Sequence, residues 1–231
     1  LTILQGNLNA DLNAVTVSVA GNFVMTGGSL SGANATYEMI GSDDQTVNIL
    51  GNVENFKVNK SGGSVVLGAD MNIPGTLTFD AGLIRTDDNY VVMGAIASVI
   101  GSSQNRGWVY GNLKKMINAG TSVSVRFEVG TEDDYTPATV NFNSVTIAGF
   151  VNAKVTINDH PEINYSGINP SRSINRFWDF TNEGVVFDRS DITFNWNGSN
   201  YDGGASTRSF IAAQFNGTAW SMLTTTSRLS L

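Results

Sequence analysis

The feature that most constrains the fold is a succession of short segments in which apolar and polar residues alternate. In a β-strand, successive side chains point to opposite faces, so this alternation predicts strands with one buried face. Clear examples are Val15–Val19, Thr46–Ile49, Phe56–Asn59, Thr76–Phe79 and Ser122–Phe127. Helical spacing of apolar residues is nowhere sustained, and the best helix candidate is the short segment 111–118 (GNLKKMIN). The sequence therefore predicts an all-β protein.

Most of these segments begin or end at Gly or Asn. The chain has 231 residues, of which 25 are Gly and 26 are Asn. Gly adopts positive φ freely, and Asn does so more readily than most other residues. We therefore expect both residue types at sharp corners between short strands.

The two halves of the chain differ in strand length and in aromatic content. Up to Tyr110 there are three Phe, three Tyr and one Trp, whereas the rest holds nine Phe, three Tyr and three Trp. The very short strands of the first half favour a β-solenoid, whose narrow interior we expect thin aliphatic ladders to fill. The longer, aromatic-rich strands of the second half, including 210–215 and 218–223, are typical of a β-sandwich. We expect a β-solenoid module at 1–112 joined rigidly to a β-sandwich module at 113–231.

Composition and charge exclude several classes of protein. The chain has no Cys, so it has no disulfide scaffold, thiolate metal site or cysteine nucleophile. Its formal net charge is −7 and its largest basic cluster is Lys114–Lys115, which argues against a nucleic-acid or anionic-membrane partner. No apolar run approaches the roughly 18 residues of a membrane helix, so we expect no membrane span. A single His, His160, leaves little material for zinc ligation or acid–base catalysis.

Paired carboxylates are the first candidates for chemistry. They occur at Asp43–Asp44, Asp87–Asp88 and Glu132–Asp134. Polysaccharide-cleaving enzymes need two carboxyl groups at a fixed separation. Asp also caps its own backbone in turns, and these pairs fall where turns are expected, with no basic residue or His beside them to complete a catalytic set. We expect turn chemistry and no enzymatic activity or cofactor.

Calcium is the second candidate. Asp188, Asp191 and Asp202 lie in an acidic stretch that also holds Asn195, Asn197 and Asn200. Carboxylate and amide oxygens are calcium ligands, but neither an EF-hand loop nor a glycine-rich calcium repeat is present. These residues are therefore weak candidates for a calcium site.

Three aromatic residues are candidates for stacking on sugar rings: Trp196, Tyr201 and Trp220. The competing interpretation is packing in the core or at a sheet edge. Strand alternation places Phe194 and Trp196 on one face, which favours an inward orientation for Trp196.

Several longer motifs resemble a recurring pattern in large secreted surface proteins of gliding and environmental Gram-negative bacteria. The resemblance extends from about Asn22 to Trp220 and is carried by segments 41–49, 53–79, 109–115, 127–130, 135–140, 173–180 and 215–220. Such proteins use the type IX secretion route and behave as adhesins or surface-layer components. The motifs are structural, so the resemblance implies fold more than chemistry. The sequence does not begin with Met, and we expect a processed product or a fragment of a longer chain.

The resemblance and the architecture together imply a non-enzymatic, extracellular, cell-surface protein. It would be an adhesin module, or a subunit of a filament or layer that assembles through β-strand edges or solenoid ends. Expected partners are other copies, flanking parts of a longer chain, or a surface polysaccharide. Segment Leu1–Leu4 is a candidate for such strand pairing. The alternatives are a carbohydrate-binding module and, with less support, a polysaccharide-degrading β-helix enzyme.

Overall fold

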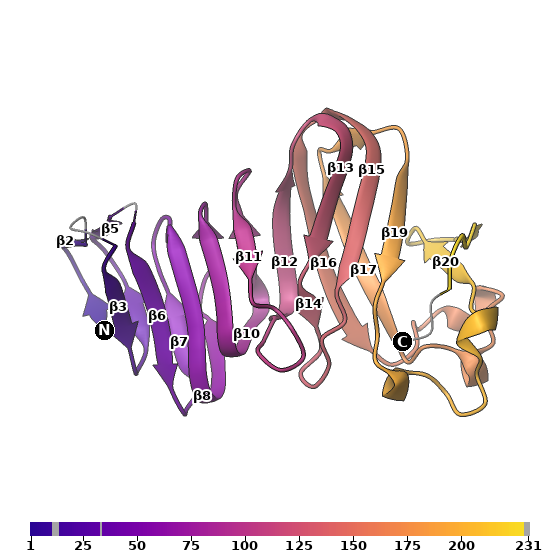
Figure 1. Ribbon diagram of the computed structural model, residues 1–231, viewed down its shortest axis with the longest axis horizontal. Coiled ribbons are helices and arrows are strands. Elements are labelled where there is room, and N and C mark those ends of the chain that lie inside the picture. Colours follow the sequence, from indigo (N-terminus) through magenta and orange to yellow (C-terminus); the bar gives the residue numbers. More distant parts are fainter. Residues whose placement is uncertain (11–13, 33, 229–231) are drawn as a thin grey trace.

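The structure, a computed structural model, describes residues 1–10, 14–32 and 34–228. It is an all-β fold in which a β-solenoid of about six turns continues into antiparallel sheets and a small C-terminal lobe. The predicted fold class, a solenoid followed by a sandwich, is confirmed. Figure 1 shows the parts in sequence order along the longest axis of the molecule, with the N-terminal coils at one end and the lobe at the other.

The solenoid has three sides, each built from parallel strands of successive coils. Its strands are β1 (Thr2–Ile3), β2 (Asn7–Asn9), β3 (Thr16–Val19), β4 (Phe23–Met25), β5 (Ser29–Ser31), β6 (Thr36–Gly41), β7 (Gln45–Asn48), β8 (Asn55–Leu67), β9 (Met71–Ile73), β10 (Thr76–Met93), β11 (Ser98–Ile100), β12 (Val109–Ile117) and β14 (Val129–Gly130). On one side β3, β6, β8, β10 and β11 pair in parallel order. The second side runs from β1, β4 and β7 through the later parts of β8 and β10 to β12 and β14. The third side holds β2 and β5 and, further on, β9, the end of β10 and the end of β12.

Ladders of stacked side chains fill the solenoid interior. One ladder runs in register through Val17, Tyr37, Phe56, Leu77 and Val99. Its three middle members are at most 2% exposed. The expectation of purely aliphatic ladders is therefore wrong, because aromatic rings occupy the same stacks and the interior is wide enough to hold them.

Asparagine has a different role from the one we expected. Within the described residues, only one Asn, Asn158, has a positive φ, whereas fifteen glycines do. Several Asn side chains instead donate hydrogen bonds to a backbone carbonyl about one coil earlier. Asn55 donates to Ala35 at 3.1 Å, and Asn89 donates to Leu67 at 2.9 Å. The amide satisfies carbonyls at the corners, where the strand ladder alone would leave them unpaired.

Two strands run around corners without a break. β8 and β10 each join segments that the sequence predicts as separate strands. Gly63 in β8 and Gly82 in β10 have φ of +60° and +98°, so the chain turns there while the ladder continues.

β12 joins the solenoid to the antiparallel part. It pairs in parallel with β10 and antiparallel with β16 (Gly149–Ile157). Segment 111–118, the best helix candidate in the sequence, lies largely within this strand, because its side chains complete the solenoid wall. The expected module boundary after residue 112 also falls inside β12, which makes the connection a continuous strand.

The antiparallel end of the solenoid's own sheet and a separate antiparallel sheet follow, and they pack face to face. One contains β12, β16 and β17 (Arg176–Glu183); the other contains β13 (Gly120–Phe127), β15 (Ala138–Ile147), β18 (Val186–Phe187) and β19 (Ser190–Phe194). Phe127 of β13 and Phe180 of β17 meet edge to face across the interface, with ring centroids 5.9 Å apart. Their core is continuous with that of the solenoid, so one hydrophobic interior runs through both parts.

The C-terminal lobe comprises residues 158–175 and 195–228. It contains the short 3-10 helices η1 (Ile163–Tyr165), η2 (Pro170–Arg172), η3 (Gly198–Asn200) and η4 (Thr207–Ser209) and the hairpin β20 (Ala212–Phe215) and β21 (Trp220–Leu223). Segments 210–215 and 218–223 were expected as sandwich strands. They form a separate two-stranded sheet instead, so the sandwich ends at β19.

Candidate functional site

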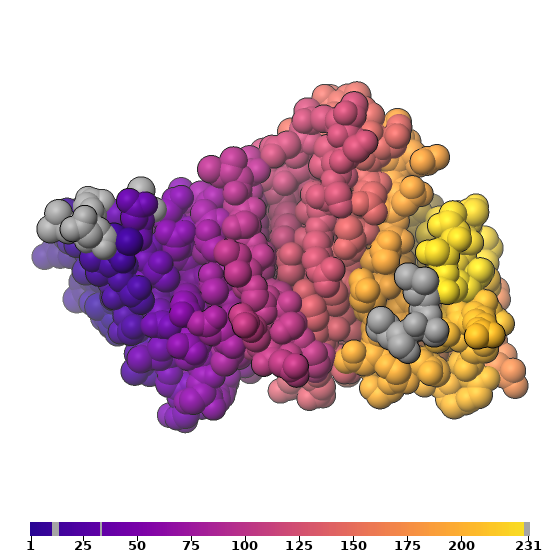
Figure 2. Space-filling model, viewed as in Figure 1, coloured from indigo at the N-terminus to yellow at the C-terminus, as the bar shows by residue number. Residues whose placement is uncertain are grey.

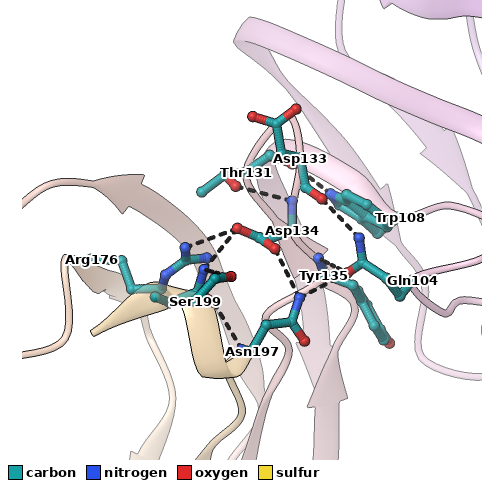
Figure 3. A network of polar contacts seen from close by, with 10 residues as sticks. Gln104, Trp108, Thr131, Asp133, Asp134, Tyr135, Arg176, Asn197 and Ser199 are labelled. Atoms are coloured by element: carbon teal, nitrogen blue, oxygen red, sulfur yellow. Dashed lines mark hydrogen bonds and ion pairs between the residues drawn. The ribbon is translucent and has the colours of Figure 1, made fainter. Parts of the chain in front are cut away.

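A polar network centred on Asp134 joins the three parts of the molecule (Figure 3). The carboxylate of Asp134 accepts hydrogen bonds from Arg176 at 3.1 Å and from Asn197 and Asn200 at 2.8 Å each. Arg176 is the first residue of β17, while Asn197 directly precedes η3 of the C-terminal lobe and Asn200 is its last residue. Both carboxylate oxygens therefore have donors.

The same network reaches the last solenoid loop. Gln104 donates to the carbonyl of Asp133 at 2.7 Å and accepts from the backbone N–H of Tyr135 at 2.8 Å. The Trp108 indole N–H donates to the carbonyl of Thr131 at 2.8 Å. Loop 131–136 is thus held between the solenoid and the C-terminal lobe.

The electrostatics of Asp134 are those of a structural anion. Partial burial raises its pKa, but hydrogen bonds from Asn197, Asn200 and Arg176 outweigh that effect and leave the pKa below its usual value. A carboxylate whose two oxygens are already bonded is poorly placed to act as a base or a nucleophile. We therefore interpret this network as the connection between the parts.

The three aspartates that are candidate calcium ligands each form hydrogen bonds or an ion pair with different residues of the protein. Asp188 accepts hydrogen bonds from Asn143 and from the backbone N–H of Ser144, at 2.6 and 2.9 Å. Asp191 forms an exposed ion pair with Arg189 at 3.8 Å. Asp202, in the C-terminal lobe, accepts from Ser173 and Asn175 and closes a loop there. Within the described part of the chain, no three His, Cys, Asp or Glu side chains are grouped so that they could hold a metal ion.

The carboxylate pairs of the solenoid have a basic neighbour, contrary to expectation. Arg85 forms ion pairs with Asp44 at 3.5 Å and with Asp87 at 3.3 Å, so the expectation of no basic residue beside these pairs is wrong. Asp44 also accepts a hydrogen bond, at 2.8 Å, from the backbone N–H of Ser64, which lies on the next coil and not in the turn of Asp44 itself. Arg85 lies two coils after Asp44, so only stacking of the coils brings the two side chains together.

The aromatic candidates fall into two groups in the lobe. Trp196 and Tyr201 both pack on Phe210, with ring centroids 6.0 Å away in each case. Trp196 lies beyond the end of β19, so strand alternation does not set its orientation, and it is half-buried. Trp220 instead packs on Phe215 at 5.1 Å and on His160 at 5.0 Å.

Trp220 borders a surface depression that we call the aromatic hollow. Its volume is about 560 Å³, and it is lined by Glu162, Tyr165, Phe215, Gly217, Thr218, Ala219 and Trp220. Tyr165 is 79% exposed. Trp220 is a candidate from the sequence alone, whereas Tyr165 and Glu162 are not, because no motif or spacing connects η1 with the β20–β21 hairpin.

The first coil of the solenoid has an open side, which we call the open coil edge. Within the described residues, β1, β2 and β3 each pair with a strand on one side only. Segment Leu1–Leu4 thus contains a strand that pairs within its own chain and whose other edge meets no strand among the described residues. At this end of the molecule, on the left in Figures 1 and 2, Leu1, Leu4 and Val15 are 45%, 69% and 37% exposed.

Comparison with known proteins identified no relative: a scan of protein-family models, a search of curated proteins and a search of solved structures each gave no match. In the ranges 1–10, 14–32 and 34–228, no helix has the length and apolar character needed to cross a membrane.

Proposed function

We propose that this chain is a non-enzymatic structural or adhesive protein of the cell surface, which assembles through the open coil edge. The partner is a further β-coil, supplied by another copy or by flanking parts of a longer chain. The secreted location and the adhesin class rest on the resemblance of its motifs to bacterial surface proteins. The observation that carries the assembly proposal is the edge of β1.

The hydrogen-bonding pattern of β1 supports this mode of assembly. The carbonyls of Leu1 and Ile3 accept hydrogen bonds from Val24 and Thr26 of the next coil, at 2.9 and 3.0 Å. In a parallel ladder the residue between two such acceptors directs its N–H and C=O the other way. Thr2 therefore presents its backbone groups at the free edge, which is a template for another strand.

The apolar interior is also incompletely covered at this edge. Ile3 and Val17 are half-buried, whereas their register partners in the next coil, Met25 and Tyr37, are 1% and 2% exposed. A further coil stacked on this edge would bury Ile3 and Val17 as fully as Met25 and Tyr37 are buried. That burial adds a hydrophobic contribution of about 25 cal/mol per Å² to the strand hydrogen bonds.

The test is sedimentation velocity across a wide concentration range, with variants of Thr2. We expect the natural sequence to associate reversibly. Thr2→Pro removes the outward N–H and should abolish association, because proline at an edge cannot donate to an added strand. Thr2→Ala keeps the N–H and is the matched control, which should associate as the natural sequence does.

Two results would contradict the proposal. The first is a monomer at every concentration, which would exclude assembly by this chain alone. The second is association that Thr2→Pro leaves unchanged, which would place the contact elsewhere. The β1–β4 pairing should survive in Thr2→Pro, because Leu1 and Ile3 make its hydrogen bonds, and a circular dichroism spectrum checks that the fold is intact.

A further inference from the structure

The aromatic hollow has walls formed by two separate parts of the C-terminal lobe. Glu162 and Tyr165 come from η1 and the residue before it, while Phe215 to Trp220 belong to the β20–β21 hairpin and its turn. Its volume of about 560 Å³ lies within the usual range of small-ligand sites. Tyr165 is 79% exposed, far more than an aromatic ring that serves packing alone.

The Trp220 side of the hollow is fixed before any ligand arrives. Its indole N–H donates to the carbonyl of Glu162 at 2.9 Å, which ties the hairpin to η1. His160 packs against Phe177, Phe215 and Trp220, with ring centroids 4.9 to 5.0 Å away. A ligand that stacks on Trp220 therefore loses little binding free energy to ordering of this side chain.

The polar groups of the hollow are suited to hydroxyl donors. Among the described residues, the Glu162 carboxylate has no hydrogen-bond or ion-pair partner, so it is available as an acceptor. Thr218 also lines the hollow; its hydroxyl donates to Oδ1 of Asn216 at 2.9 Å, which leaves its oxygen to act as an acceptor. The residues that line the hollow include no Lys or Arg, which disfavours an anionic ligand next to the Glu162 carboxylate.

We propose that the aromatic hollow binds a neutral glycan. Trp220 and Tyr165 contact the C–H faces of sugar rings, and Glu162 and Thr218 hydrogen-bond to the sugar hydroxyls. Sugars combine apolar ring faces with many hydroxyl donors, which is the combination that this hollow presents. The site does not depend on the open coil edge, since the two lie at opposite ends of the molecule (Figure 1).

Affinity gel electrophoresis tests the proposal, with the polysaccharide cast into the native gel. The probes are the neutral polymers hydroxyethylcellulose, xyloglucan, mannan and starch, with polygalacturonate as the anionic counterpart. We expect at least one neutral polymer to retard the natural sequence, and polygalacturonate not to. Tyr165→Ala should weaken that binding about tenfold through loss of ring stacking, and Glu162→Gln should weaken it several-fold.

The control applies the same change to an aromatic residue of the solenoid. Tyr90→Ala removes a half-buried tyrosine from β10 and should leave retardation unchanged. Thermal unfolding confirms that each variant is folded, and Tyr165 is exposed enough for its removal to be tolerated. Three results would overturn the proposal: no retardation by any neutral polymer, equal retardation by polygalacturonate, or full binding by folded Tyr165→Ala.

Discussion

Single residues connect the parts of this molecule, and the clearest example is Asp134. Its partner Arg176 is 7% exposed, and the Nε and Nη1 atoms of Arg176 are buried without a hydrogen-bond partner among the described residues. Removing the carboxylate would leave a buried cation without its anion. Removing one member of a buried ion pair destabilises the fold strongly, because the remaining charge is buried without a partner. This cost is much larger than the stability that the intact pair adds relative to apolar residues in its place.

We predict that Asp134→Asn lowers the free energy of unfolding by about 3 kcal/mol. Urea denaturation measures the change. Asp133→Asn is the matched control, since it makes the same carboxylate-to-amide change one residue earlier, on an exposed side chain. The control should stay within about 0.5 kcal/mol of the natural sequence. Equal effects of the two substitutions would show that the network does not stabilise the fold.

The pH dependence of this difference follows from the lowered pKa of Asp134. A carboxyl group with a lower pKa in the folded state stabilises the fold above its unfolded pKa, and this contribution is lost as pH falls through the folded pKa. The stability gap between the natural sequence and Asp134→Asn should be full at neutral pH. It should shrink below about pH 4, the ordinary pKa of Asp. A gap that is constant down to pH 2 would contradict this electrostatic account.

Sequence reasoning reached Asp134 only as one member of an acidic turn. Its partners Arg176 and Asn197 are 42 and 63 residues away, and no local pattern links them. The predicted positive φ of Asn was wrong for a similar reason, because the amide groups act between coils that are adjacent in space but distant in sequence. Trp220, by contrast, could be singled out from its residue type alone.

At the scale of elements, alternation predicted the strands well and their ends poorly. Periodicity reports which face of a strand is buried, and that information is local. Whether the ladder stops at a corner depends on the neighbouring coil, so β8 and β10 are longer than any segment the sequence marked. Segment 111–118 is a strand for the same reason: β10 and β16 provide its hydrogen-bond partners on both sides.

β12 makes a specific prediction because it carries the connection between the two parts. At Gly111 the φ is +122°, and a Cβ atom would lie 2.0 Å from Oγ1 of Thr86, which accepts a hydrogen bond from the backbone of Asn112. Gly111→Ala should therefore lower the free energy of unfolding by about 3 kcal/mol, through overpacking and backbone strain.

The control for Gly111 is Gly203→Ala. An added Cβ at Gly203 has no atom within 4 Å, so this change should be nearly neutral. Urea denaturation compares the two, and the slope of the transition shows whether solenoid and sandwich still unfold together. If Gly111→Ala were as stable as Gly203→Ala, the backbone at β12 would have to relax in a way the structure does not show.

At the scale of the whole molecule, the two ends of the solenoid are different. The first coil presents the free edge of β1, whereas the last coil passes through β12 into the antiparallel sheets, with β14 and β16 paired to that strand. At the other end β12 already has strand partners on both edges, so a complete coil can be added only at the first one. The hydrophobic core continues into the sandwich at the other end, where among the described strands only β11, paired with β10 alone, keeps an open edge on the last coil.

This asymmetry restricts how copies of the chain can assemble. Head-to-tail stacking needs a completely open coil at both ends, and in the described part of the chain the solenoid has one only at its first coil. Two copies can still meet edge to edge across a two-fold axis, with β1 of one copy antiparallel to β1 of the other. We therefore predict that assembly through the open coil edge stops at a dimer, with the C-terminal lobes at its two outer ends.

Light scattering coupled to size-exclusion chromatography gives the mass of the assembly, and negative-stain electron microscopy gives its shape. The expected particle is elongated and two-fold symmetric, and Thr2→Pro should yield only single copies. Open-ended filaments would contradict the prediction, because they require a second, different contact on the sandwich or the lobe. A two-fold particle joined through its lobes would contradict it as well, since the free edge of β1 would then be unused.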